Sequence, residues 1–464
     1  MKTRSETDAL GTVQVPEDAY YGAQTQRARE NFPVSSIRMP LPLIRSLGLI
    51  KRCAAVVNHD LALIETRLAD AIEKAAREVE EGLLDDQFVL DVFQTGSGTS
   101  TNMNVNEVVA GRANELLTGN RGGKDPVHPN DHVNRCQSSN DVFPSAIHIA
   151  AVTEIRNGLL PSLERLHGSL LAKAAAFADV IKLGRTHLQD AVPIRLGQEF
   201  GGYARQVELA IIRIEGAEQG LFELALGGTA VGTGINAHPD FATKTIALIV
   251  DATQCPFIEA VNHFEAQGAQ DAAVAASGAL KSVAVGIGKI ANDLRWLASG
   301  PRCGLGEITL PSLQPGSSIM PGKVNPVIPE VVVQVAAQVV GNDAAITLGG
   351  QWGCFELNTM LPVIGHNLLQ SIALLTSSAR LLAEKCIDGI EANRERCKGN
   401  IEQSLSLATY LAPTIGYDRA SAISKEAFAT GKTIRGLVLE KRLMDEAEFD
   451  RLINESLSPL EGKP

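Results

Sequence analysis

The chain has 464 residues, a length that corresponds to about three domains of roughly 150 residues each. Hydrophobic residues make up 45% of it and charged residues 20%, which is typical of a soluble globular protein. We find no run of about 18 uninterrupted apolar residues, so we expect no membrane partner. The net charge of −11, without a block of lysine and arginine, argues against nucleic acid as a partner.

The first residues, Met1 to Asp8, lack the apolar core of a signal peptide, and we therefore expect a cytoplasmic protein. The seven cysteines form an odd, scattered set that contains no C-x-x-C pair. In a large chain that is not exported, this pattern predicts reduced thiols rather than a disulfide framework or a zinc site.

Taken in chain order, residues 1–138 combine turns with shorter helices, and residues 117–125 are especially rich in turn formers. Residues 139–391 are dominated by apolar side chains at helical spacing. The stretches that show this spacing are 152–170, 207–224, 270–298, 329–348 and 361–386. Pro161 predicts a kink in the first stretch, and Pro329 suits the first turn of the fourth. Residues 392–464 contain short amphipathic helices and a polar tail.

The five long stretches predict the fold class. Helices of about 20 to 30 residues are roughly 30–45 Å long, and several of them in one domain imply a bundle. Alanine and glycine lie on more than one face of 270–298, so we expect this helix to be buried between subunits; a monomeric core helix is the alternative. We predict an all-α protein with a central bundle, 139–391, between two smaller, mostly helical domains, 1–138 and 392–464.

The strongest chemical signal is the stretch 316–326, Gly-Ser-Ser-Ile-Met-Pro-Gly-Lys-Val-Asn-Pro. Its glycines and prolines exclude a regular element and predict a loop that is able to move. The ammonium of Lys323, the amide of Asn325 and the hydroxyls of Ser317 and Ser318 suit a carboxylate ligand. A plain linker would explain the glycine, serine and proline residues, but not the methionine, lysine and asparagine between them.

Two further clusters offer neutral donors to an anion. Residues 96–104 read Gly-Ser-Gly-Thr-Ser-Thr-Asn-Met-Asn, and their glycines permit close backbone approach, although such runs are usually turns. Residues 137–141, Gln-Ser-Ser-Asn-Asp, stand directly before a helical pattern. They predict a helix N-cap whose first-turn N–H groups would favour an anion, and plain capping is the alternative interpretation.

Two histidine-containing clusters complete the set. His187 lies among Arg185, Thr186 and Asp190 in an otherwise apolar context, which favours a catalytic histidine over a structural one. Residues 128–132 read His-Pro-Asn-Asp-His, but the proline prevents an i, i+4 pair of ligands on one helix face, so we expect no metal there. Because all five clusters are far apart in sequence, one site built from them needs several helices or several subunits.

The loop 316–326 resembles the signature of the fumarase/aspartase superfamily, and the wider pattern resembles the class II fumarases from about residue 10 to about residue 455. The other matching stretches are 21–27, 93–99, 128–131, 137–141, 184–190 and 227–234. Aspartases share 184–200 and 327–330. The choice of fumarase rests on Gln26, on 93–97 and on Ser139, where aspartases typically carry threonine. The resemblance implies a hydro-lyase that interconverts fumarate and (S)-malate by anti elimination or addition of water. An aspartase-type ammonia lyase is the alternative.

A catalytically silent scaffold is a hypothesis from a different class, since the superfamily includes lens structural proteins. Such a relative could lose the residues of its loop without losing its bundle. Here Ser317, Lys323, Asn325 and His187 are all present, which favours an enzyme.

The resemblance also implies a role for each matching residue. Ser317 would remove the C3 proton of malate, Lys323 and Asn325 would stabilise the aci-carboxylate intermediate, and His187, oriented by Glu330, would handle the departing water. The residues implied in holding the substrate are Ser97, Gly98, Thr99, Ser138, Ser139, Asn140, Thr186, Ser318 and Val324.

The resemblance implies an assembly and a second site as well. In the family, four subunits pack their bundles into one helical core, and each active site draws on three chains, so we expect a homotetramer. A second anion site is implied at His128, Pro129, Asn130 and Asp131. Asp125 places an acid near it where many relatives carry arginine, which puts its occupancy in doubt. The sequence contains no metal-ligand cluster and no phosphate-cradling motif, so we expect neither a metal nor any other cofactor.

Overall fold

The computed structural model describes residues 2–456, which divide into two compact units. Of the described residues, unit 1 comprises 2–161, 210–284 and 335–377, and unit 2 comprises 162–209, 285–334 and 378–456. Several long helices contribute residues to both units. The division into domains 1–138, 139–391 and 392–464 is a different partition of the chain and stays a prediction.

The predicted all-α class is confirmed, because the strands of the described residues form only two-stranded pairs. The first part of unit 1 holds β1 (Thr3–Asp8), β2 (Gly11–Pro16), α1 (Ala23–Asn31), α2 (Leu41–Asp60), α3 (Thr66–Glu80), α4 (Thr99–Thr118) and α5 (Ser139–Glu154). Its later parts hold β5 (Glu223–Leu224), α8 (Phe241–Thr253), β6 (Ile258–Glu259), α9 (His263–Gly268), β8 (Gly353–Cys354) and β9 (Leu357–Asn358). Both α2 and α4 are 20 residues long, so the expectation of shorter helices before residue 139 was wrong for these two.

The long helices are α6 (Leu160–Ala176), α7 (Leu196–Glu218), α10 (Asp271–Leu297), α11 (Val327–Gly350) and α12 (Leu361–Lys385). Unit 2 adds β3 (Ile181–Thr186), β4 (Gln189–Arg195), β7 (Ile308–Thr309) and β10 (Glu391–Ala392). Its C-terminal helices are α13 (Arg394–Gln403), α14 (Ala408–Ile415), α15 (Tyr417–Thr430), α16 (Ile434–Glu440) and α17 (Glu446–Ser456). The five long helices cover most of the five stretches predicted from apolar spacing.

The stretch 152–170 does not form one regular helix. The end of α5 is followed by a π-helical turn, Ile155–Leu159, after which α6 begins one residue before Pro161. Proline has no N–H to donate to the turn before it, and its ring crowds that turn, so a wider turn accommodates it. The irregularity predicted at Pro161 is therefore present as a π-helical turn directly before α6.

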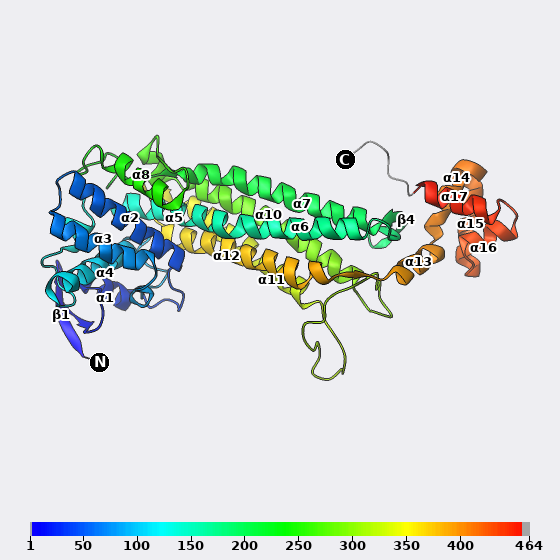
Figure 1. Ribbon diagram of the computed structural model, residues 1–464, viewed down its shortest axis with the longest axis horizontal. Helices are drawn as coiled ribbons and strands as arrows, with labels where there is room; N and C mark the ends of the chain where they lie inside the picture. Colours follow the sequence, from blue (N-terminus) through cyan, green and yellow to red (C-terminus); the bar gives the residue numbers. More distant parts are fainter. Residues whose placement is uncertain (1, 457–464) are drawn as a thin grey trace. The chain divides into compact units, whose positions relative to one another are not determined.

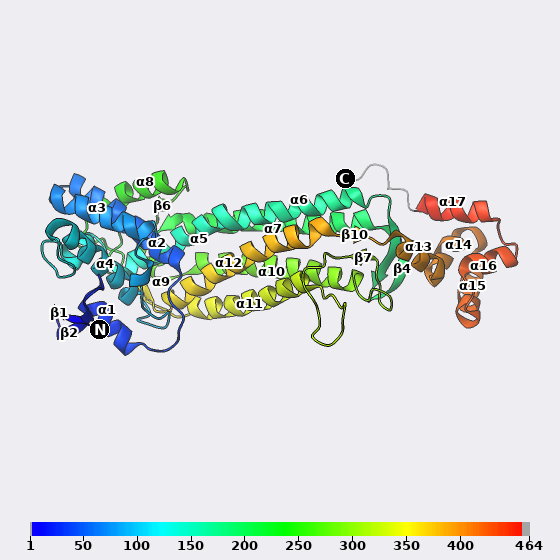
Figure 2. The same ribbon diagram turned by 60° about the horizontal axis from the view of Figure 1, so that its bottom comes forward.

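Helix α2 lies at the centre of unit 1, where it packs against α3, α5, α8 and α4 (Figure 1). Its buried face carries Leu43, Leu47 and Ile50, all fully or almost fully enclosed. In the same unit the parts of α10, α11 and α12 lie side by side (Figure 2), and Asn342 of α11 donates hydrogen bonds to Gln370 and Ser371 of α12. The elements that carry candidate site residues in this unit are therefore held by a well-packed core.

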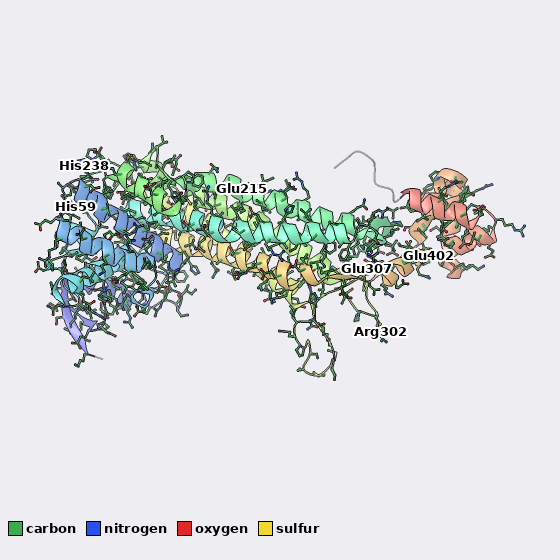
Figure 3. The ribbon with its side chains drawn as sticks, in the orientation of Figure 1. His59, Glu215, His238, Arg302, Glu307 and Glu402 are labelled. Carbon is green, nitrogen blue, oxygen red and sulfur yellow. The ribbon has the colours of Figure 1, made fainter. Side chains whose placement is uncertain are left out.

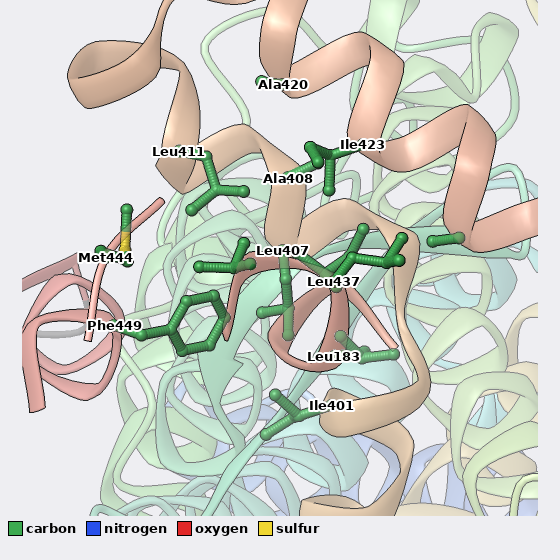
Figure 4. Packing of buried hydrophobic residues seen from close by; sticks show 13 residues of the cluster. Leu183, Ile401, Leu407, Ala408, Leu411, Ala420, Ile423, Leu437, Met444 and Phe449 are labelled. Carbon is green, nitrogen blue, oxygen red and sulfur yellow. The ribbon is translucent and has the colours of Figure 1, made fainter. Parts of the chain in front are cut away.

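Unit 2 has a separate apolar core around its C-terminal helices (Figure 4). Leu407 and Leu411 meet Leu437 and Phe449 there, and Leu183 of β3 joins the same cluster. The β3–β4 hairpin is thus anchored by its apolar side to the C-terminal helices of the unit.

Helices α10 and α11 are long and apolar enough to cross a membrane, by length and composition alone, with mean hydropathies of 1.3 and 1.4. Buried bundle helices have the same properties. Asp343 of α11 is buried and accepts hydrogen bonds from Ser277 (2.8 Å) and Lys281 (2.5 Å) of α10. Because such a paired charge between two helices is typical of a packed protein interior, we interpret both as bundle helices.

Candidate active site

The N-terminus of α5 is built by the motif at 137–141. Ser138 is the N-cap, as predicted: its hydroxyl accepts the N–H of Asn140 (3.2 Å), and its own N–H is donated to Asp141 (2.9 Å). The other oxygen of Asp141 accepts the N–H groups of Gly227 (3.0 Å) and Thr229 (2.9 Å). One buried carboxylate therefore fixes both the start of α5 and the glycine-rich loop beside it.

The start of α4 carries the second cluster. Gly98 caps the helix with a φ of 74°, and a Cβ at this position would lie 2.3 Å from the ring of Phe143. Only glycine satisfies both the left-handed conformation and this close approach. The hydroxyls of Ser97 and Thr99 lie 2.7 Å apart, and a cavity of about 450 Å³ opens beside Thr99.

Unit 1 brings these two clusters together. Helices α4 and α5 pack on each other, and Asn102 of α4 donates a hydrogen bond to the hydroxyl of Ser139 (2.9 Å). On the other side Asn140 donates to the carbonyl of Ala230 (2.8 Å), within the stretch 227–234. The hydroxyl and amide groups predicted to hold a substrate thus converge around the N-terminus of α5, where the helix dipole favours an anion.

The His128 segment forms a single π-helical turn, Pro129–Val133, directly before the α5 motif. His128 caps this turn, and its Nδ1 accepts the N–H groups of Asn130 and Asp131 (both 3.2 Å). The Asp131 carboxylate also lies 3.4 Å from Nδ1, so the second ring nitrogen is the one that can donate to a ligand. Asn130 and Asp131 are exposed, and burial lowers the pKa of His132.

Unit 2 places Thr186 and His187 at the tip of the β3–β4 hairpin, an element that helical periodicity alone did not predict. The two turn residues, His187 and Leu188, have φ values of 56° and 58°, the conformation of a tight hairpin turn that usually contains glycine or asparagine. Both side chains are exposed. A cavity of about 560 Å³ lies on one side of His187, with Arg185, Tyr203 and Lys289 in its lining.

The hairpin is held by a charge network around the buried Glu307, which Figure 3 labels. Both carboxylate oxygens of Glu307 accept hydrogen bonds from the Arg185 guanidinium, each at 2.8 Å, and Lys182 lies 3.3 Å away. Burial raises the pKa of Glu307, but the hydrogen bond and positive charges of Arg185 and Lys182 outweigh it, and the net pKa is lowered. Arg185 immediately precedes Thr186 and His187, so this network fixes the base of the turn that presents them.

The predicted loop 316–326 is confirmed as a segment without helix or strand before α11. The hydroxyl of Ser317 accepts the N–H groups of Ile319 (3.2 Å) and Met320 (2.9 Å). The loop closes on itself where the N–H of Gly316 donates to the carbonyl of Lys323 (2.7 Å) and Asn325 donates to that of Gly316 (2.8 Å). The side chains of residues 317–324 lie at the surface: Ser318, Lys323 and Val324 are exposed, while Ser317 is partly so.

Glu330 lies in the first turn of α11 and is half-buried. Within residues 2–456 of this chain, no hydrogen bond joins it to His187. The candidate residues consequently form two sets: Ser97–Thr99, His128–Asp131 and Ser138–Asn140 in unit 1, and Thr186, His187, Ser317–Asn325 and Glu330 in unit 2.

The structural roles of Lys51, Asp141 and Glu307 were not predicted. Asp141 belonged to a recognised motif, and its position three residues after Ser138 is the signal of a capping box. Glu307 lies in an apolar stretch, where a lone charged residue is the available signal, whereas Lys51 stands next to Arg52 and carries no such signal. In the part of the chain that the structure describes, no group of three or more histidine, cysteine, aspartate or glutamate side chains could hold a metal ion.

The fold and these two sets define a class of protein: an all-α protein whose loops and helix N-termini carry hydroxyl, amide and ammonium groups, which are donors of the kind that suits a small carboxylate. A family model described as lyase matches residues 11–341, and one described as fumarase C C-terminus matches residues 407–456. The chain belongs to the class II fumarate hydratase family of these lyases.

Individual relatives agree. The chain is 56% identical to a class II fumarate hydratase of Nitrosomonas europaea over 96% of this chain and 97% of that one. It is 53% identical to a mitochondrial fumarate hydratase of Danio rerio over 97% of this chain and 89% of that one. A crystal structure of class II fumarase from Schistosoma mansoni matches with a TM-score of 0.94 and 42% identity, over 97% of this chain and 98% of that one. A Brucella melitensis fumarate lyase:delta crystallin structure, described as bound to cobalt, matches with a TM-score of 0.93 and 46% identity, over 98% of both chains.

Proposed function

We propose that this chain is a fumarate hydratase, a hydro-lyase that reversibly adds water to fumarate to form (S)-malate. The observation that carries the chemical part of the proposal is the environment of Ser317 in the loop 316–326. Two main-chain N–H groups point at its hydroxyl oxygen, and Lys323 follows in the same loop. A serine is a poor base at its ordinary pKa, and N–H dipoles and a nearby cation are what favour its alkoxide.

In this mechanism Ser317 removes the C3 proton of malate. The product is an aci-carboxylate, which has two negative charges on one carboxyl group. Fixed donors aimed at developing charge are generally the largest catalytic term, and we assign this role to Lys323 and Asn325. Closure of the loop over the substrate would bring the base and these donors in together and exclude water.

Unit 1 supplies the groups that we assign to the substrate carboxylates and hydroxyl. They are Ser97, Gly98 and Thr99 at the start of α4 and Ser138, Ser139 and Asn140 at the start of α5. Hydroxyl and amide donors together with the N-terminal dipole of α5 suit a dianion. Thr186, Ser318 and Val324 of unit 2 complete the substrate-binding set.

We assign proton transfer to the departing hydroxyl to His187, with Glu330 orienting its ring. Since no hydrogen bond joins these two residues in one described chain, their pairing is proposed to form between copies. This proposal includes a homotetramer with sites shared between chains. The exposed apolar residues Val331, Val340 and Leu348 on α11 support a role for that helix in assembly.

We also propose a second anion site at His128, Pro129, Asn130 and Asp131. Because Nδ1 of His128 accepts two main-chain N–H groups, the other ring nitrogen is the one that can donate to a carboxylate. Asp125 is exposed nearby in sequence, and its negative charge opposes anion binding. The remaining parts of the proposal are a cytoplasmic location and catalysis without metal or other cofactor.

The proposal is tested by incubating purified protein with malate and with aspartate side by side and following the ultraviolet absorbance of fumarate. Turnover of malate with no release of ammonia from aspartate is expected. Ammonia release would instead make the chain an aspartase, and inertness towards both substrates would support a silent scaffold. Treatment with EDTA followed by dialysis should leave the rate unchanged. A rate that is lost and then restored by a divalent ion would overturn cofactor-free catalysis.

A further inference from the structure

Lys51, in the middle of α2, is fully enclosed, with 0% of its surface exposed. Its ammonium donates hydrogen bonds to the side-chain oxygens of Asn134 (3.0 Å) and Gln137 (2.9 Å). Both acceptors are neutral amides. Burial of a lysine ammonium against neutral groups is costly and rare, and the mechanism above gives this residue no role.

The two acceptors belong to the segment that builds the candidate site. Gln137 directly precedes Ser138, the N-cap of α5, and Asn134 directly follows the π-helical turn of the His128 segment. Asn134 also donates to the main-chain carbonyl of Gln137 (3.1 Å). The Lys51 ammonium therefore pins both ends of the short connection between the two anion-binding segments.

The same network reaches a residue that we assign to substrate binding. The side-chain oxygen of Asn134 accepts hydrogen bonds from Asn106 (3.1 Å) and Asn102 (3.3 Å) of α4. Asn102 donates to Ser139 as well (2.9 Å). Lys51, Asn102, Asn106 and Ser139 are buried, and Asn134 and Gln137 are partly buried. A shift at Lys51 is therefore transmitted to Ser139 through three hydrogen bonds, by way of Asn134 and Asn102.

Lys51 also carries charge. The negative charge that acts on it is Asp141, which is itself fully buried and occupied by three N–H donors. A carboxylate held by those donors is not free to neutralise the ammonium through a direct contact, and Lys51 bonds to amides instead. Its positive charge thus lies beside Gln137, the residue before the N-cap of α5, and it attracts an anion bound at that N-terminus.

We propose that Lys51 is a positioning residue of the dicarboxylate site: its buried ammonium fixes residues 134–140 and supplies positive charge to the substrate carboxylate held by Ser139 and Asn140. This inference rests on the proposed function and names the group that tunes substrate affinity in it. The chain's overall charge of −11 repels a dianion, and a buried cation near the site offsets that repulsion.

The charge of Lys51 should respond to pH in the neutral range. Burial lowers the pKa of Lys51 to about 7, against the raising effect of Asp141. A bound dianion stabilises the ammonium and raises that pKa again. The free protein therefore loses this charge above about pH 7, substrate binding takes up a proton there, and KM rises by up to about tenfold per pH unit until the complex titrates as well.

The other titratable groups on the elements packed against α2 are not expected to lose a positive charge above pH 7 as Lys51 does. Burial lowers the pKa of His132 and of His148, so both are neutral above pH 7, and it raises the pKa of Asp141 and of Glu107. On α3, Glu80 pairs with Arg52 and Glu73 with Arg77; on α8, Lys244 and Asp251 are exposed. If one of these groups caused a pH dependence of KM, that dependence would persist without Lys51.

The test compares wild-type protein with Lys51→Met, which keeps a long apolar side chain and removes the charge. We expect KM for malate at about pH 6 to rise by roughly tenfold or more in Lys51→Met, with a much smaller change in kcat. The rise of KM above about pH 7 should disappear in this variant. Cys53→Ala is the matched control: the residue is equally buried on the same helix, and its loss should leave the pH profile of KM unchanged.

A second measurement needs no turnover, and its first result comes from wild-type protein alone. Succinate, a dicarboxylate that cannot be hydrated, is titrated into wild-type protein by calorimetry at about pH 8 in two buffers of different ionisation enthalpy. We expect uptake of a fraction of a proton on binding, which Lys51→Met abolishes. Absence of proton uptake in the wild type, or a Lys51→Met variant with wild-type KM and pH profile, would overturn this inference alone. Wild-type protein that neither turns over malate nor binds succinate would overturn the proposed function, and this inference with it.

Discussion

At the scale of single residues, a substitution of Lys323 distinguishes between two roles for its ammonium, transition-state stabilisation and substrate anchoring. Its ammonium should bind the doubly charged aci-carboxylate more strongly than the ground-state carboxylate. Lys323→Ala should therefore lower kcat by about 10²- to 10³-fold and raise KM far less. Initial rates over a range of malate concentrations measure both constants. Lys398→Ala is the control, because Lys398 is an exposed lysine outside the proposed site. A variant with normal kcat and only a raised KM would make Lys323 a substrate anchor.

A substitution of Gly98 tests whether the start of α4 requires a residue without a side chain. A side chain there would meet the ring of Phe143 at 2.3 Å, in addition to the strain of a φ of 74°. Gly119, at the other end of α4, has a similar φ of 78° but no atom within 4 Å of the added Cβ. Gly119→Ala should cost about 1 kcal/mol from backbone strain alone, whereas Gly98→Ala should cost several times more and impair substrate binding. Equal losses of Tm in the two variants would contradict this explanation.

The residues that could be predicted are those whose side chains form a compact motif along the chain. Ser317, Lys323 and Asn325 fall within nine residues, and Ser138 to Asp141 form a capping box. Lys51 could not be assigned in this way, because its partners Asn134 and Gln137 are more than 80 residues away in sequence. Its function depends on a contact that only the packing of α2 against the α5 segment creates.

At the scale of elements, apolar periodicity predicted the long helices and missed the hairpin that carries His187. The stretches around 270–298 and 361–386 form α10 and α12 because their apolar residues recur every three or four positions. The strands β3 and β4 are only six and seven residues long and carry buried lysine and proline, so their alternation is weak. What stabilises them is the contact of Leu183 with the C-terminal core and the salt bridge of Arg185 to Glu307, both distant in sequence.

Glu307→Gln tests that network. The substitution removes the carboxylate shared by the partly buried Arg185 and the fully buried Lys182, which keeps Glu199 as a partner, at a cost of about 3 kcal/mol at neutral pH. We expect a lower Tm and a lower kcat, since the hairpin presents His187. The folded pKa of Glu307 is lowered, so its contribution is present above its ordinary pKa of about 4.3 and is lost as pH falls through the folded value. The difference in Tm between variant and wild type should therefore shrink in acid.

The chain offers a matched control for this experiment. Asp179 receives the same two-pronged contact from Arg394, at 2.8 and 3.0 Å, but this pair is exposed. Exposed pairs contribute little because solvent screens them. Asp179→Asn should leave Tm and kcat essentially unchanged. If both substitutions lowered Tm equally, burial would not be the reason for the importance of Glu307.

At the scale of the whole molecule, the sequence predicted an assembly, and two structural observations support that prediction. Candidate site residues fall into two sets, one in each unit, and α11 exposes apolar residues along a helix of 24 residues. In a bundle helix, apolar residues that face outward are expected to meet another copy of the chain. Which copies meet could not be derived from periodicity, because a stripe of small residues specifies close packing and not the partner.

Subunit complementation tests whether sites are shared between chains of the proposed homotetramer. His187→Asn and Ser317→Ala should each be inactive on its own. If the two residues reach one site from different subunits, dissociating and reassembling an equal mixture should create some sites that carry neither lesion. Random mixing leaves about one site in four intact, so roughly a quarter of wild-type activity should return. Analytical ultracentrifugation would confirm that the mixed species are tetramers. Verified mixed tetramers without recovered activity would mean that His187 and Ser317 come from one chain, and the shared site would have to be abandoned.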